Sequence, residues 1–125
     1  MSQILLVMAG GAIGAAMRFL SGAAALRVLG PGYPWGTLFV NIAGGLLMGV
    51  LAGSLARMNA PEGWRLFIGV GILGGFTTFS AFSLEAALMI ERGQLGVALG
   101  YALASVIGSV LALFAGLAIA RTVAA

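Results

Sequence analysis

The sequence contains no cysteine, no histidine and no lysine, and it carries few charges of either sign. Without cysteine it has no disulfide, no thiolate metal site and no catalytic thiol. Without histidine it lacks the most common metal ligand and proton shuttle. It also lacks a nucleophile beside a base, a carboxylate pair and a phosphate-binding loop. We therefore expect neither an enzyme nor a nucleic-acid-binding protein.

Hydrophobic residues are abundant instead, at 62% of 125 residues, while charged residues make up only 7%. Because soluble proteins are about 25% charged, this composition indicates an integral membrane protein. A spanning helix needs about 20 apolar residues, so the length allows four spans. The first apolar run is expected to be a retained helix, not a cleaved leader. We predict one all-α transmembrane domain over 1–125, with spans at 4–29, 37–55, 64–90 and 95–119.

Short polar turns separate the predicted spans, so neighbouring helices should run in opposite directions. The six cationic side chains, all arginine, divide almost evenly between the two ends of such a bundle. Orientation normally follows an excess of Lys and Arg in cytoplasmic loops, and no such excess exists here. Charge alone leaves two alternatives: a weakly biased single orientation, or insertion in both orientations with pairing of opposite copies.

Small residues recur at four-residue spacing in the second and fourth spans, for example from Gly45 to Gly53 and from Gly96 to Gly116. Small residues on one helix face let backbones approach closely in lipid. Four helices are too few to satisfy every such face, so we expect an oligomer.

The stretch from Gly74 to Ser83 is the most unusual part of the third span, because two glycines and two threonines follow one another inside an apolar run. These residues weaken a helix, and non-helical backbone at membrane depth survives only inside protein or beside a polar cavity. Interrupted helices of this kind build ion sites in transporters. The sequence therefore predicts a third helix that is broken near its middle.

Polar side chains within the spans fall at helical spacing. A lone hydroxyl usually bonds to a carbonyl of its own helix, but two stripes and an amide together indicate a polar track. These residues are Asn41 in the second span, Thr77, Ser80 and Ser83 in the third, and Tyr101, Ser105 and Ser109 in the fourth.

The chemistry of this track suits a small anion, because hydroxyls and an amide donate hydrogen bonds. Phe79 and Phe82 lie on a neighbouring helix face, and the edge of a phenylalanine ring is partly positive. Glu85 is the exception, with two readings left open. It accepts bonds from Ser or Tyr hydroxyls and orients them, or it faces the headgroups near Arg92.

Three segments resemble the Fluc (CrcB) family of fluoride channels: residues 10–19, with the sequence GGAIGAAMRF, residues 36–44, with GTLFVNIAG, and residues 71–83, with GILGGFTTFSAFS. The third is the most diagnostic. The resemblance covers essentially the whole chain. The sequence departs from the family pattern at Phe19, where tyrosine is common, and at Ala81, where threonine is common and would add a hydroxyl to the track.

The resemblance implies a dual-topology homodimer of two antiparallel subunits in a bacterial inner membrane, with two pores that carry fluoride passively out of the cytoplasm. It implies a structural sodium ion at the dimer centre, held by the backbone carbonyls of Gly74 and Thr77. It places Arg18 near a vestibule. The pore residues that it implies are Asn41, Phe79, Ser80, Phe82, Glu85, Tyr101, Ser105 and Ser109.

Two other functions compete with this reading. A small multidrug transporter also has four spans, but it uses a glutamate in its first helix to exchange protons for cationic drugs. The first span here has no acid, and Glu85 is the intramembrane candidate. A non-transporting assembly subunit would explain the glycines but not the broken helix or the hydroxyl stripes.

Overall fold

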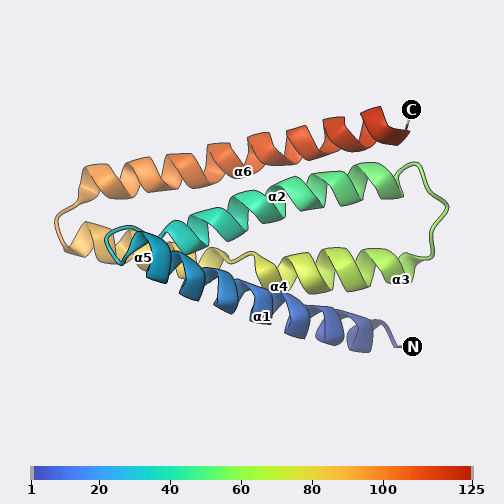
Figure 1. The fold of residues 1–125 in the computed structure, drawn as a ribbon, viewed down its shortest axis with the longest axis horizontal. Helices are drawn as coiled ribbons and strands as arrows, with labels where there is room; N and C mark the ends of the chain where they lie inside the picture. Colours follow the sequence, from blue (N-terminus) through green and yellow to red (C-terminus); the bar gives the residue numbers. More distant parts are fainter. Residues whose placement is uncertain (1, 125) are drawn as a thin grey trace.

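Four long apolar helical segments make up the computed structural model, which describes residues 2–124 (Figure 1). Helix α1 spans Gln3–Leu29, α2 spans Trp35–Leu55, and α6 spans Leu95–Ala124. The third segment, from Glu62 to Glu91, is divided into several elements. All four are long and apolar enough to cross a membrane. The chain is therefore an all-helical, multi-pass membrane protein.

The observed helices differ from the predicted spans by a few residues at their ends. The second begins at Trp35 rather than at residue 37, and the fourth continues to Ala124 rather than stopping at 119. Gly30, with φ of +80°, follows α1, and its N–H donates to Leu26 O at 2.9 Å. Gly93, with φ of +79°, lies between the third and fourth segments. Both positions need glycine because other residues rarely adopt this conformation.

The third segment is assembled from short helix α3 (Glu62–Trp64), the π-helix η1 (Arg65–Leu73), α4 (Gly74–Phe76) and α5 (Phe79–Glu91). Between α4 and α5 the backbone is extended, with φ/ψ of −85°/157° at Thr77 and −150°/124° at Thr78. These two residues lie within the stretch that the sequence singles out. No sequence pattern predicted the π-helix that precedes them.

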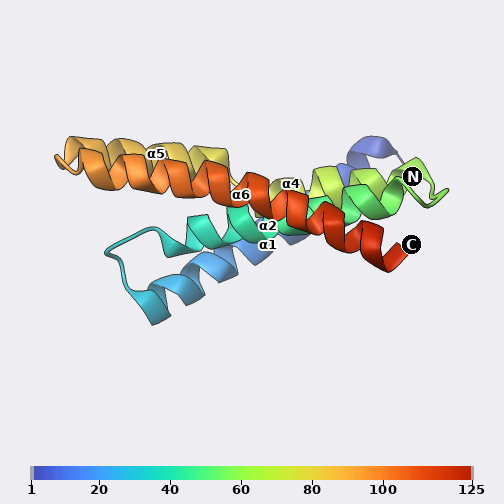
Figure 2. The ribbon, with the colours of Figure 1, turned by 90° about the horizontal axis from the view of Figure 1, so that it is seen from above.

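Helix pairs pack through glycine faces, because a residue without a side chain lets two backbones touch. Helix α2 packs on α6, where Gly49 faces the backbone of Leu113 and Gly116 faces the backbone of α2. Helix α1 packs on η1, and a Cβ added to Gly10 would lie 2.9 Å from Gly71 Cα. Figure 2 shows α5 and α6 running side by side, and both views show the two chain termini at the same end.

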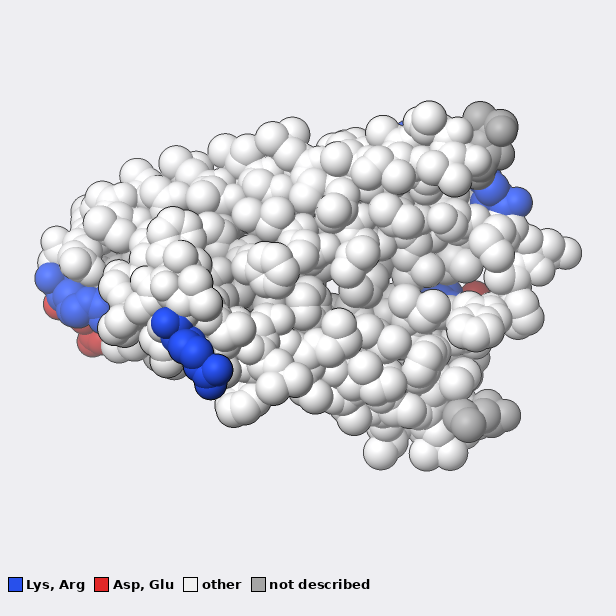
Figure 3. Space-filling view, in the orientation of Figure 1, with Lys and Arg blue, Asp and Glu red and all other residues white. Residues whose placement is uncertain are grey.

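Charge is confined to the ends of the bundle on the face shown in Figure 3, and the middle is free of it. Most large apolar side chains along the helices are exposed, among them Phe19, Leu111 and Phe114. An apolar belt between charged ends is what a lipid environment requires.

Candidate functional site: extended backbone beside a polar cavity

The two extended residues, Thr77 and Thr78, use their side chains to end one helix and begin the next. Thr77 Oγ1 donates to Leu73 O at 3.0 Å, in the last helical turn before the extended residues. Thr78 Oγ1 accepts the N–H of Ala81 at 3.1 Å and so caps the start of α5. Such an N-cap contributes about 1 kcal/mol. The threonine pair therefore gives local reasons for the chain to leave and re-enter helical geometry here.

Asn41 on α2 holds the extended backbone from outside the third segment. Its Nδ2 donates to Thr78 O at 2.9 Å, and its Oδ1 accepts Thr78 N–H at 2.7 Å. The side-chain amide thus pairs with both backbone groups of one extended residue. Because both ends of the amide are used, its orientation is fixed, and two backbone groups that lack a helical partner are satisfied.

The same contacts leave two carbonyl oxygens without their helical donors. In a continuous α-helix, Gly74 O would accept from Thr78 N–H, but that group donates to Asn41. Thr77 O would accept from Ala81 N–H, but that group donates to Thr78 Oγ1. Free carbonyl oxygens suit a hard cation such as Na⁺, and unwound backbone supplies them in transporters. The donor set at Gly74 and Thr77 therefore fits a sodium ion.

Arg18 on α1 also contacts the third segment. Its Nε donates to Gly75 O at 3.1 Å, so the arginine of the first span is bonded to the third segment close to the extended residues. The side chain is half-buried. This contact satisfies a third carbonyl of the region and places a permanent positive charge next to it.

A cavity of about 380 Å³ opens between α2, the extended residues with the start of α5, and α6. The Phe79 and Phe82 rings line it, with centroids 5.4 Å apart. Ser105 is 7% exposed, and within the described part of the chain its Oγ has no hydrogen-bond partner. A buried hydroxyl without a partner is costly and indicates a place where a ligand or water belongs. The polar or aromatic residues around the cavity are Asn41, Thr77, Thr78, Phe79, Phe82, Ser105 and Ser109.

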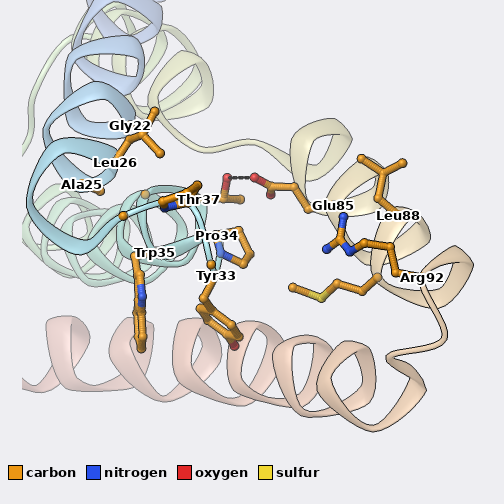
Figure 4. A pocket seen from close by; sticks show the side chains of 15 residues that line it. Gly22, Ala25, Leu26, Tyr33, Pro34, Trp35, Thr37, Glu85, Leu88 and Arg92 are labelled. Carbon is orange, nitrogen blue, oxygen red and sulfur yellow. Dashed lines mark hydrogen bonds between the residues drawn. The ribbon is translucent and has the colours of Figure 1, made fainter.

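Glu85 does not line this cavity, and its carboxylate accepts hydrogen bonds from two hydroxyls. Thr37 Oγ1 donates to its Oε2 and Tyr101 OH donates to its Oε1, each at 3.0 Å. Figure 4 shows the Thr37 bond as a dashed line. Tyr101 is fully buried, and its ring lies 5.1 Å from that of Phe82. The sequence left two interpretations of Glu85 open. The structure agrees with the one in which its carboxylate accepts hydrogen bonds from hydroxyls.

The structure therefore brings most of the predicted site residues to one region around α2, α5 and α6. Ser80 lies at its edge, exposed, with its Oγ 3.3 Å from Thr78 Oγ1. Ser83, by contrast, donates to Phe79 O of its own helix at 2.9 Å. Sequence reasoning missed Thr37 as a site residue. The signal was a hydroxyl at the start of an otherwise apolar span.

These features define a small four-span membrane protein with a polar cavity beside extended backbone. Residues 5–117 match the family described as CrcB-like protein, Camphor Resistance (CrcB). The chain is 61% identical over 125 residues to a protein of Phenylobacterium zucineum named "Fluoride-specific ion channel FluC", with 98% of each chain covered. Proteins of the same name from Caulobacter vibrioides and Novosphingobium aromaticivorans are 55% and 54% identical, with at least 98% of each chain covered. The chain belongs to the CrcB-like family.

Proposed function

We propose that this chain is a fluoride-selective passive ion channel that lets fluoride leave the cytoplasm across a bacterial inner membrane. The observation that carries the proposal is the identity of 54–61% over nearly the full length with relatives named fluoride-specific ion channels. The polar cavity supports it from the side of chemistry. Fluoride is small and strongly hydrated, so a pore must replace its water with hydrogen-bond donors.

In this proposal fluoride passes through the cavity of about 380 Å³. The buried Ser105 hydroxyl, which has no partner among residues 2–124, is available as a donor. Ser109 and the edges of the Phe79 and Phe82 rings continue the path, because ring edges are partly positive. Hydroxyls bind fluoride without the tight trap of a buried arginine, which matters because an ion must also leave.

We further propose that two copies pair in opposite orientations, each with its own pore, and that a sodium ion sits between them. The carbonyls of Gly74 and Thr77, whose helical donors are diverted, would hold the ion. Gly74 is exposed on the single chain, which leaves it accessible to a partner copy. The ion would offset repulsion among four carbonyl dipoles from two subunits and so stabilise the dimer.

Fluoride efflux from liposomes tests the proposal directly. The purified protein is reconstituted, and release is followed with a fluoride electrode, with chloride release measured in parallel. We expect fast fluoride efflux without chloride efflux. Ser105→Ala removes the unpaired hydroxyl and should reduce fluoride efflux by about 10–150-fold, because the loss of a hydrogen bond to an ion costs about 1.5–3 kcal/mol.

The matched control is Ser83→Ala, since Ser83 bonds within its own helix and does not line the cavity. This variant should conduct at the wild-type rate. A well-folded wild-type dimer that releases no fluoride would overturn the channel assignment. Wild-type conduction by Ser105→Ala would leave the channel standing and remove this serine from the path.

A further inference from the structure

A second cavity, of about 350 Å³, lies at the end of the bundle opposite the chain termini, between the loop that joins α1 to α2 and the end of α5 (Figure 4). Thr37 and Glu85, which share a hydrogen bond, line it together with Tyr33, Trp35, Met89 and Arg92. Glu85 also contacts Tyr101, whose ring touches Phe82 of the cavity described above. The two cavities are therefore linked through Glu85 and Tyr101.

The charges of this second cavity are unusual for the mouth of an anion path. The Glu85 carboxylate faces it and would repel fluoride. Arg92 lines the same cavity, and in Figure 4 its guanidinium points inward on the side of Glu85. Its Nε donates to Gln94 Oε1 at 3.4 Å, and no hydrogen bond in the described part of the chain occupies its terminal nitrogens. They remain available to an anion.

We propose that Arg92 is the anion-recruiting residue at this mouth of the pathway, where it offsets the charge of Glu85 and raises the local fluoride concentration. The inference rests on the proposed channel function and adds a residue to it. Arginine suits the role because it stays charged at every physiological pH. A guanidinium at an exposed position attracts an anion without trapping it, because water screens the interaction.

The surrounding groups agree with this role. Burial raises the pKa of Tyr33 above its usual value of 10, so this loop tyrosine is neutral at pH 7 and adds no negative charge. Tyr33 also packs edge-on against Tyr101, at 5.5 Å between ring centroids, so the loop forms one wall over the Glu85 contact. Glu91 precedes Arg92 but does not line the cavity.

The absence of native cysteine allows a charge-exchange experiment. Arg92→Cys is purified, treated in detergent with a cationic or an anionic methanethiosulfonate reagent, and reconstituted for fluoride efflux at low and high ionic strength. Within a Debye length, one unit charge changes a local anion concentration by about three-fold. We expect efflux by Arg92→Cys about three-fold below wild type at low salt. The cationic reagent should restore it, and the anionic reagent should lower it further. At about 1 M salt the differences should vanish, because the Debye length falls to about 3 Å.

Arg27→Cys is the matched control. Arg27 is an exposed arginine in the last turn of α1, and it lies outside the cavity lining. Its efflux should change much less with either reagent than that of Arg92→Cys, because its side chain does not enter the cavity. The inference is overturned if Arg92→Cys conducts like wild type at low salt, if both reagents act alike, or if Arg27→Cys responds equally. A wild-type protein without fluoride efflux would instead refute the proposed function itself.

Discussion

Replacing Asn41 with aspartate should separate the two bonds that hold the extended backbone. Aspartate keeps an oxygen at the place of Asn41 Oδ1, which accepts the Thr78 N–H at 2.7 Å. A second oxygen replaces Asn41 Nδ2, the donor that lies 2.9 Å from Thr78 O. Leaving this half-buried acceptor without its donor costs about 1–3 kcal/mol. We expect Asn41→Asp to lose about that much unfolding free energy, and Asn41→Leu, which removes both bonds, to lose about twice as much.

Unfolding in mixed micelles, followed through the fluorescence of Trp35 and Trp64, measures this change, and fluoride efflux is recorded on the same preparations. Efflux should fall together with stability, because Thr78 and its neighbours line the cavity. Asn59→Asp provides the control, since it makes the same chemical change in the exposed loop after α2. The reasoning is refuted if the unfolding free energy of Asn41→Asp stays within about 0.5 kcal/mol of wild type, the range of ordinary surface substitutions.

Two further predictions concern helix packing and the proposed ion. Gly49→Ala places a Cβ against the carbonyl of Leu113 and should lower the unfolding free energy by about 1–3 kcal/mol in the same assay. Gly96→Ala, with nothing within 4 Å, should leave it unchanged or raise it. Equal effects of the two substitutions would contradict the glycine contacts. Replacing Na⁺ by N-methylglucamine during purification should shift dimers toward monomers on size exclusion and lower fluoride efflux. Unchanged behaviour in thoroughly sodium-depleted buffer would remove the ion from the proposal.

The helices themselves were readable from the sequence, because hydropathy over about 20 residues is a local signal. The ends of the helices were harder to predict. Helix α2 begins at Trp35, before its predicted start, and α6 continues past Arg121. The glycine spacing in the second and fourth spans predicted close packing, and Gly49 and Gly116 lie at such contacts. Gly96 meets nothing within 4 Å, because its end of α6 lies beyond the crossing with α2. Spacing alone cannot tell which part of a stripe lies at a crossing.

The site was predictable as a set of residue types and not as a set of pairs. Asn41 and the threonines both stood out, but the pairing of Asn41 with Thr78 depends on how α2 crosses the third segment. Thr37 was overlooked because one hydroxyl at the start of a span usually bonds to its own helix. Its actual partner, Glu85, is 48 residues away. The π-helix over Arg65–Leu73 has no sequence signature of its own.

The bond between Arg18 and Gly75 has a consequence for the order in which the protein is made. The two residues are 57 positions apart, so α1 and α2 are synthesised before the carbonyl that receives Arg18 exists. An arginine at the centre of an inserting helix costs about 2.5–3.5 kcal/mol. The first helix must therefore carry this cost through the translation of the second. The Gly75 carbonyl offsets part of this cost only when the third segment arrives, which ties completion of the bundle to the segment that contains the extended residues.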